Sequence, residues 1–201
     1  MSAFIPTTCL SDAMQGINNM DAAIKPLKGS YRFAGKALTV KMVPGDNLIV
    51  LRAIRESCPG DVLVIDAKGD TSRAIAGDFV VGMAKTMGIQ AIVVDGAIRD
   101  IEGIRQLDFP VFSKGSTVAA SHKEGKGELN VPISCGGVSV RPEDFIVGDA
   151  DGVVVISAEL KENIFLNAEE KMKQDEIREA KISNNKQAVL AYLDQMLKSH
   201  F

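Results

Sequence analysis

Three charged residues near the middle of the chain have the types and spacing of a small binding site. Asp78 directly precedes a run with helical periodicity, whereas Arg99 and Asp100 follow shortly after the apolar run AIVVD. A helix N-terminus offers unpaired backbone amides and the positive end of the helix dipole, which together attract carboxylates and oxyanions. A guanidinium next to a carboxylate can hold an anionic molecule and a divalent cation side by side. The pattern therefore predicts a site for a small anion.

The predicted helix start has two interpretations. In the first, Gly77 leads into the helix and the amides of Phe79 and Val80 are among its unpaired donors, so this segment binds the anion. In the second, Asp78 is simply the N-cap, a position at which aspartate is favoured. Residue types alone leave both interpretations open.

Asp100 allows the same two kinds of interpretation. As one carboxylate ligand, with waters and substrate oxygens completing an octahedral shell, it suits a hard cation such as Mg²⁺ or Mn²⁺. Alternatively, Asp100 caps a short helix over 101–107 and Arg99 is its surface partner. The sequence pattern by itself does not decide between a metal ligand and a cap.

The elements around these residues are predicted from hydrophobic patterns. The runs at 62–66 and 91–95 are apolar without polar alternation, which is typical of strands buried on both faces. Between them, 78–87 carries apolar residues at helical spacing, so the segment forms a parallel strand, helix and strand crossover. We expect a turn at Asp95 and Gly96. The charged residues after it then lie outside the carboxyl ends of the strands, where parallel sheets bind ligands.

Three further predictions complete the expected fold. A helix begins between Thr7 and Ser11 and runs to Met20. The short, turn-rich and β-branched segments within 109–156 favour antiparallel strands and hairpins. From 158 to 201 the composition changes to long charged helices, which we expect to pack on the core of the chain or on a neighbouring subunit.

Composition limits the classes of protein that the chain can belong to. Its 201 residues, 46% of them apolar, fit one domain, and the net charge of −3 argues against direct binding of nucleic acid. Cys9, Cys58 and Cys135 form no metal-binding or disulfide pattern, so we expect three buried thiols in a reducing compartment. No apolar run could span a bilayer, and the N-terminus lacks the basic region of a signal peptide. We therefore expect a cytoplasmic protein.

Several motifs, taken in their order and spacing, resemble those of one family. They are SDAM at 11–14, GDVLVID at 60–66, GDTSRAIAGD at 69–78, VVDGAIRD at 93–100, FPVF at 109–112 and PISCGGVSVRPEDFIVGDADGVVVI at 132–156. The chain thereby resembles the RraA-like family, which includes class II pyruvate aldolases and the regulator of ribonuclease E activity. These aldolases act on 4-hydroxy-4-methyl-2-oxoglutarate and 4-carboxy-4-hydroxy-2-oxoadipate. Two departures from the family pattern, RPED at 141–144 and the missing proline after VVVIS, lie away from the expected site.

The resemblance implies an α/β fold, a three-layer β/β/α swivelling domain. A single domain is expected over 1–201, with 158–201 as a helical C-terminal tail. The resemblance also implies a homotrimer, or a hexamer of two trimers, with sites between subunits. In this family the C-terminal helix of a neighbouring subunit adds an acidic residue to the site. Candidates for this residue are Glu169, Glu170, Asp175 and Glu176.

The resemblance also implies a role for each site residue. It assigns the divalent metal to Asp100, the pyruvyl oxygens of the substrate to Arg99, and further substrate contacts to the amides of Phe79 and Val80. Asp78 matches the family acid that works through a metal-bound water. These roles favour the functional interpretation of each residue over the capping one.

The activity implied by the resemblance is cleavage of a 4-hydroxy-2-oxo acid to pyruvate and a second carbonyl compound. The expected cofactor is Mg²⁺, Mn²⁺ or another divalent cation. Oxaloacetate decarboxylation is expected as a side activity, because loss of CO₂ yields the same enolate. The alternative is a non-catalytic regulator that binds and inhibits ribonuclease E or another protein. The expected partners are therefore a small 2-oxo acid and other copies of the chain, without a membrane.

Overall fold

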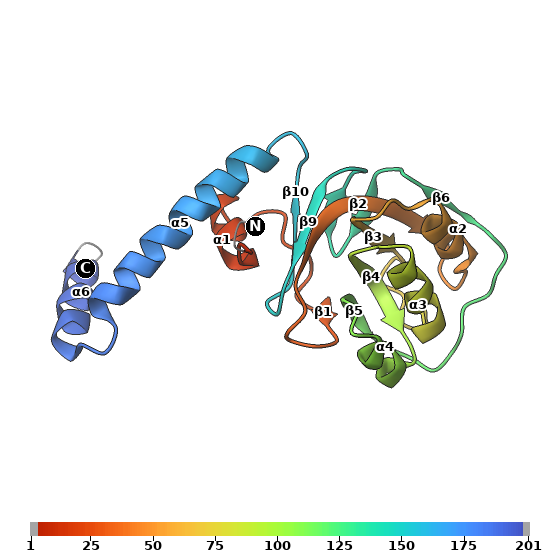
Figure 1. Cartoon of the computed structure of the whole chain (residues 1–201), viewed down its shortest axis with the longest axis horizontal. Helices are drawn as coiled ribbons and strands as arrows, with labels where there is room; N and C mark the ends of the chain where they lie inside the picture. The colour runs from red at the N-terminus through yellow and green to blue at the C-terminus, as the bar shows by residue number, and fades with distance from the viewer. Residues whose placement is uncertain (1–3, 199–201) are drawn as a thin grey trace.

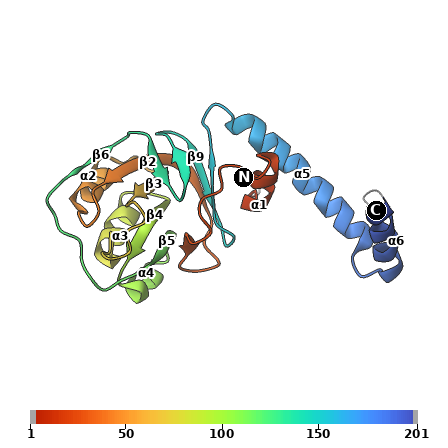
Figure 2. The ribbon, with the colours of Figure 1, turned by 180° about the vertical axis from the view of Figure 1, so that it is seen from behind.

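The computed structural model describes residues 4–198 and consists of a rounded α/β body and a helical arm that projects from it (Figures 1 and 2). The arm is formed by α5 (Lys161–Ile182) and α6 (Lys186–Lys198). Helix α1 (Thr7–Ala13) lies beside the first part of α5, where the arm joins the body (Figure 1). The predicted helical tail is therefore present, and its last residues, 199–201, lie outside the described part of the chain.

The body is built on one curled sheet with the strand order β1-β5-β4-β3-β2-β9-β10, and β6 pairs with β2. Strands β2, β3, β4 and β5 form a parallel block, whereas the outer strands pair antiparallel. A separate hairpin consists of β7 and β8. The strands are β1 (Lys25–Pro26), β2 (Phe33–Met42), β3 (Asp61–Asp66), β4 (Ala91–Ile98), β5 (Val111–Ser116), β6 (Gly127–Leu129), β7 (Ile133–Cys135), β8 (Val138–Val140), β9 (Phe145–Gly148) and β10 (Val153–Ile156).

The body of the protein consists of three layers. Helices cover one face of the sheet (Figure 1). Val81 and Ile104 of these helices belong to one buried cluster with the side chains on that face of the central strands. On the opposite face, Cys135 of the hairpin is buried in a second cluster together with Val93. This is the three-layer β/β/α arrangement that was predicted, and it explains why the central strands are apolar on both sides. The helices of the first layer are α2 (Leu48–Glu56), α3 (Asp78–Thr86) and α4 (Ile101–Leu107).

The predicted turn at Asp95 and Gly96 is wrong, because both residues lie inside β4. The pairing of β4 with β5 shifts by one residue between Val94 and Ala97, so that Asp95 and Gly96 together stand opposite Lys114 alone. Two residues opposite one define a β-bulge, which bends a strand and increases its twist. The strand therefore continues beyond the expected turn and ends directly before the predicted site.

Helix α1 is shorter than predicted, since it ends at Ala13 and not at Met20. The chain after it adopts left-handed backbone conformations, including Gly16 with φ of 76°, which terminate the helix. Its start is held by Asp149, whose carboxylate accepts hydrogen bonds from the Thr7 amide (2.8 Å) and hydroxyl (2.7 Å). The helix is thereby attached to the turn between β9 and β10.

The expectation of three buried thiols is also wrong. Cys135 is buried, Cys9 is partly exposed and Cys58 is exposed. Cys58 lies in the connection between α2 and β3, on the surface of the body, so its position in a polar turn outweighs the usual preference of cysteine for burial.

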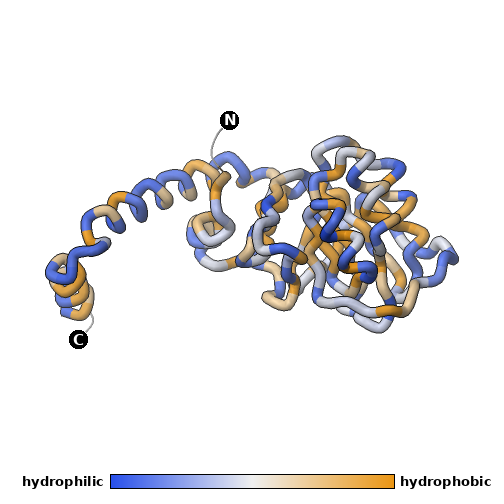
Figure 3. Tube along the Cα trace, turned by 60° about the horizontal axis from the view of Figure 1, so that its bottom comes forward, coloured by the Kyte–Doolittle hydropathy of each residue, from blue (hydrophilic) through white to orange (hydrophobic). Residues whose placement is uncertain are grey.

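The arm alternates between polar and apolar residues along its length (Figure 3). Helix α6 leaves large apolar side chains open to solvent, with Leu190 50%, Leu193 46% and Leu197 53% exposed. Such a stripe on a single chain is typical of a surface that another surface covers. No helix within residues 4–198 is long and apolar enough to cross a membrane.

Candidate functional site

The predicted cation and carboxylate lie directly after β4, at the carboxyl end of the parallel strands. The Arg99 amide donates a hydrogen bond to the carbonyl oxygen of Ala76 (3.0 Å), in the loop that leads into α3. On the other side, the Thr117 amide donates to the carbonyl oxygen of Ile98 (2.9 Å). The end of β4 is thus held between the segment before α3 and the segment after β5.

Asp100 has an uncommon backbone conformation. Its φ of 58° and ψ of 44° lie in the left-handed region, which aspartate tolerates better than most residues. It occupies the N-cap position of α4, but its side chain makes no capping hydrogen bond. Instead, its Oδ2 lies 3.3 Å from Nε of Arg99, and the two side chains are 42% and 43% exposed. The carboxylate is therefore not used by the helix and faces solvent beside a cation.

A cavity of about 300 Å³ contains this pair. The hydroxyl groups of Ser116 and Thr117 add hydrogen-bonding groups to the charges of Arg99 and Asp100. A small organic acid fits a space of this volume and polarity. The lining residues are Arg99, Asp100, Ile101, Ser116, Thr117 and Val118.

Gly77 brings the first turn of α3 against the pair. It occupies the N-cap position of α3, and a Cβ atom there would overlap Oδ2 of Asp100 and lie 3.3 Å from Cγ of Arg99. Only glycine leaves room for this approach. In the same turn, the amide of Val80 has no hydrogen-bond acceptor within residues 4–198. The first turn of α3 therefore differs from the prediction of two unpaired amides, because the Phe79 amide has an acceptor in Asp78.

Asp78 is the first residue of α3, and its side chain points toward α4. Its Oδ1 accepts a hydrogen bond from the Phe79 amide at 2.7 Å. A Cβ atom at Gly103 of α4 would lie only 2.5 Å from its Oδ2, so the carboxylate packs directly on the backbone of α4. Asp78 is thus not the N-cap of α3, which is Gly77. The Phe79 amide is not free in this structure, because it donates its hydrogen bond to the Asp78 carboxylate.

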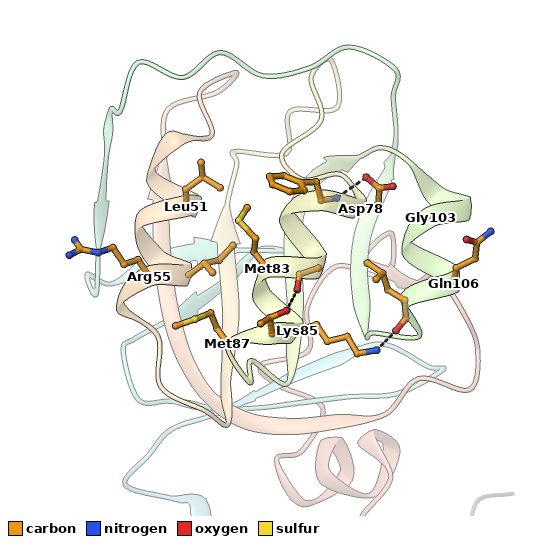
Figure 4. Close-up of a pocket in the computed structure, with 13 residues that line it drawn as sticks. Leu51, Arg55, Asp78, Met83, Lys85, Met87, Gly103 and Gln106 are labelled. Atoms are coloured by element: carbon orange, nitrogen blue, oxygen red, sulfur yellow. Dashed lines mark hydrogen bonds between the residues drawn. The ribbon is translucent and has the colours of Figure 1, made fainter.

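Asp78 lines a second cavity, of about 980 Å³, between α2, α3 and α4 (Figure 4). Apolar side chains, among them Leu51 of α2, Met83 of α3 and Met87 directly after α3, form most of this groove. The Phe79 side chain also belongs to it and is 77% exposed. The structure therefore divides the predicted residues between two neighbouring spaces. The arginine and carboxylate after β4 meet the glycine before α3, whereas the aspartate that begins α3 faces the apolar groove.

Asp100 is the side chain best placed to hold a divalent cation. Within the described residues, no three His, Cys, Asp or Glu side chains gather closely enough to form a site from protein ligands alone. Mg²⁺ is commonly held by one or two carboxylates, with waters and substrate oxygens as its other ligands. The exposed carboxylate of Asp100, next to the hydroxyl groups of the small cavity, fits a site of that kind.

Sequence reasoning did not select Ser116 and Thr117. We expected antiparallel strands after residue 109, whereas β5 pairs parallel with β4. The antiparallel prediction is correct for the β7–β8 and β9–β10 hairpins. Because the carboxyl ends of neighbouring parallel strands meet at one sheet edge, recognising β5 as parallel would have placed its end beside Arg99.

The fold and the site define a class of three-layer α/β proteins in which a cation, a carboxylate and a helix start meet at the carboxyl ends of parallel strands. A family model described as RraA-like, Aldolase/RraA, matches residues 7–155. The chain belongs to this family.

Similar proteins have been named as an enzyme and as an inhibitor. A protein of Halalkalibacterium halodurans, named as a candidate 4-hydroxy-4-methyl-2-oxoglutarate aldolase, is 58% identical over 193 residues, which cover 96% of this chain and 92% of the relative. A 4-hydroxy-4-methyl-2-oxoglutarate aldolase of Thermus thermophilus is 34% identical over 150 residues, with coverage of 75% and 91%. The solved structure of the RNA-processing inhibitor RraA from Thermus has a TM-score of 0.70 and 34% identity, and covers 78% of this chain and 93% of that one.

Proposed function

We propose that the protein is a divalent-metal-dependent aldolase. Its substrate is a 4-hydroxy-2-oxo acid of the 4-hydroxy-4-methyl-2-oxoglutarate type, and its products are pyruvate and a second carbonyl compound. One observation carries the proposal: Gly77 contacts Asp100 and thereby joins the first turn of α3 to the ion pair of Arg99 and Asp100. The names of the two aldolase relatives support the reaction class.

Arg99 binds the pyruvyl end of the substrate. Its guanidinium is positively charged and presents several donors in one plane, which matches a carboxylate and an adjacent keto oxygen. The amides of Phe79 and Val80 add hydrogen bonds from the first turn of α3. For the Phe79 amide to do so, the carboxylate of Asp78 has to release it. Substrate binding is therefore coupled to a movement of the Asp78 side chain.

Asp100 is the proposed ligand of the cofactor, which is Mg²⁺, Mn²⁺ or another divalent cation. When bound, the cation supplies Lewis-acid stabilisation of the negative charge that develops on the substrate. A single exposed carboxylate suits a cation that keeps most of its coordination shell for waters and substrate oxygens.

In the proposed reaction the C3–C4 bond of the substrate breaks. The 4-hydroxyl group loses its proton and becomes the second carbonyl, while the electron pair of the broken bond enters the pyruvyl fragment as an enolate. Protonation at C3 then gives pyruvate. Arg99 stabilises the enolate by its fixed positive charge, and Asp78 accepts the hydroxyl proton through a water. Because decarboxylation of oxaloacetate yields the same enolate, we propose it as a side activity.

We also propose a homotrimer, or a hexamer of two trimers, in the cytoplasm, with sites between subunits. The exposed apolar stripe of α6 and the exposed Phe79 support association. The acidic candidates Glu169, Glu170 and Glu176 lie on α5, which leads away from the body of its own chain (Figure 1). The fourth candidate, Asp175, is on the same helix and forms ion pairs within it. An acid from α5 would therefore serve a neighbouring copy.

The alternative is a regulator that binds and inhibits ribonuclease E or another protein without catalysis. The name of the similar Thermus inhibitor supports it. The apolar groove between α2, α3 and α4 is a surface to which a protein could bind. Inhibition through such a surface does not require the carboxylate of Asp100, and this difference separates the two functions.

The test is pyruvate release from oxaloacetate and from 4-hydroxy-4-methyl-2-oxoglutarate, with Mg²⁺ and with EDTA. We would compare the wild type with Asp100→Asn and with the control Asp108→Asn. Asp108 is a suitable control because its backbone is also in the left-handed conformation, but it lies at the other end of α4. We expect EDTA and Asp100→Asn to abolish release and Asp108→Asn to preserve it. Release that survives both EDTA and Asp100→Asn would refute the metal assignment. If the wild type acts on neither compound, binding to ribonuclease E becomes the next measurement.

A further inference from the structure

A largely buried ion pair spans the bulge that precedes the site. Oδ1 of Asp95 lies 2.7 Å from Nζ of Lys114, and the two side chains are 9% and 21% exposed. The other oxygen of Asp95, Oδ2, accepts a hydrogen bond from the Gly136 amide at 2.8 Å. Lys114 also approaches Oδ2 of Asp21 at 3.2 Å. The pair therefore joins β4, β5, the β7–β8 hairpin and the N-terminal segment at one point.

The bulge decides on which side of the sheet the following residues lie. Side chains alternate between the two faces of a strand, so one inserted residue reverses the alternation for every residue after it. Arg99 and Asp100 come directly after the bulged strand, and the Thr117 amide donates a hydrogen bond to the carbonyl oxygen of its last residue. If the bulge were lost or shifted, the guanidinium and the carboxylate would change their orientation relative to the small cavity.

The same bulge holds the loop that leads to α3. The carbonyl oxygen of Asp95 accepts a hydrogen bond from the Gly69 amide (3.0 Å), and the Ala97 amide donates to the carbonyl oxygen of Asp70 (3.3 Å). A Cβ atom at Gly96 would lie 2.8 Å from that same oxygen of Asp70, so the loop and the bulge are in close contact. Both halves of the site, the end of β4 and the start of α3, are therefore aligned through this segment.

We propose that Asp95 and Lys114 are positioning residues, whose ion pair across the bulge fixes the direction in which Arg99 and Asp100 enter the small cavity. The role of these last two residues rests on the proposed aldolase function. A buried ion pair is weak evidence for added stability, because desolvation offsets much of the attraction between the charges. Its effect on a bulge is geometric, since the pair forms in the register that places Lys114 opposite Asp95.

The principal variant is Lys114→Met, which keeps the length of the side chain and removes the charge. We expect kcat for pyruvate release to fall by about 100-fold, the loss typical when reacting groups are misplaced by about 1 Å. Lys114→Arg preserves the ion pair and should retain most of the wild-type activity. Val155→Ala is the control for a loss of stability alone, because Val155 is buried in the apolar cluster that contains Val93 and Cys135 but lies on β10. It should lower the melting temperature and leave kcat unchanged.

A double variant covers the case in which Lys114→Met does not fold. Asp95→Asn combined with Lys114→Met leaves no lone buried charge but still lacks the ion pair. We expect its kcat to stay at least about tenfold below that of the wild type. A wild-type kcat in this double variant, or a kcat in folded Lys114→Met equal to that of Val155→Ala, would overturn the proposal.

A second measurement does not depend on activity. Amide hydrogen exchange of the segment 97–100 reports the opening of the end of β4. Faster exchange there in Lys114→Met but not in Val155→Ala supports the proposal even if the wild type cleaves none of the tested acids. In that case only the aldolase function fails. Unchanged exchange in Lys114→Met contradicts the positioning role, whatever the wild type catalyses.

Discussion

Arg99 serves the proposed chemistry through the shape of its guanidinium as well as its charge. A lysine at the same position keeps the charge but offers a single ammonium point in place of a planar group. The side chain of Arg99 is 43% exposed and its ion pair with Asp100 is accessible to solvent, so the pair contributes little to stability. Replacing Arg99 should therefore change activity without changing the fold.

We expect Arg99→Lys to lower kcat/KM for pyruvate release by about 100-fold, as when one donor to a developing oxyanion is lost. The melting temperature should stay that of the wild type. Arg105→Lys is the matched control, because Arg105 forms an exposed ion pair with Glu102 on α4. Near-normal turnover of Arg99→Lys in a steady-state assay would show that charge alone is sufficient.

At this scale the sequence allowed the place of Arg99 and Asp100 after a strand to be predicted, but not the direction of every candidate side chain. Arg99 and Asp100 follow a buried strand, and the topology of parallel sheets places such residues at the ligand-binding edge. The direction of Asp78 depends on the close approach of Gly103 from another helix. That approach is a property of how α3 and α4 pack, and no spacing within either segment encodes it.

Among the elements, the loop after β5 owes its position to one buried carboxylate. Oδ1 of Asp46 accepts hydrogen bonds from the amides of Leu48 and Glu124 (both 3.1 Å), and Oδ2 accepts one from the amide of Lys126 (2.9 Å). Burial of the Asp46 carboxyl acts to raise its pKa, but the backbone amides outweigh burial and hold the pKa below its usual value. The charged form of Asp46 thus stabilises the contact between the start of α2 and this loop.

We expect Asp46→Asn to lower the free energy of unfolding at pH 7 by about 1–3 kcal/mol, the cost of weakening buried charge-assisted hydrogen bonds. Because the pKa of Asp46 is lowered in the folded state, its contribution is complete above the unfolded pKa, about 3.9, and is lost as the pH falls through the folded value. The difference between wild type and variant should therefore shrink in acid. Urea unfolding at pH 7 and pH 3 measures it.

Glu128→Gln is a suitable comparison for this measurement, because Glu128 forms an exposed ion pair with Lys41. Its effect on the free energy of unfolding should be below about 1 kcal/mol. If Asp46→Asn and Glu128→Gln change stability equally at pH 7, the buried carboxylate does not have the role described.

Elements whose character is local were predictable, and those that depend on a distant partner were not. The β3, α3 and β4 crossover follows from two apolar runs and one amphipathic run. The bulge at Asp95 and Gly96 was missed because an Asp-Gly pair commonly forms a turn, and only the pairing with β5 shows otherwise. The end of α1 is an exception, because its cause is local and was still missed: apolar residues continue up to Met20, although the backbone has already left the helix by Gly16.

In the molecule as a whole, the arm exposes apolar side chains that no other part of the same chain covers within residues 4–198. Helix α6 packs on α5, and its apolar residues Leu190 and Leu193 are open to solvent. A surface of this kind is stabilised when a second surface covers it. Helix α6 is therefore expected to take part in assembly and to contribute little to the folding of the body, whereas Ala168 of α5 is buried in a core cluster with Val147 and Val154.

Replacing Leu190 and Leu193 together by glutamine should leave the melting temperature of the body nearly unchanged and shift the protein to a lower mass. Sedimentation velocity at micromolar concentration measures the mass. Gln187→Ser with Gln195→Ser is the control, because these residues are on the same helix and are already polar. A mass equal to that of the wild type in the leucine variant would exclude α6 from the subunit interface.

Strand β2 has partners from distant parts of the chain. One of its edges pairs with β3, which follows soon after, while the other pairs with β6 and β9, which come much later. During synthesis on the ribosome, β2 therefore keeps an open edge until the chain has emerged beyond Gly148. An open strand edge in a nascent chain is a template for pairing with other nascent chains. Slower translation at lower temperature, or a chaperone that shields this edge, should accordingly raise the yield of folded protein.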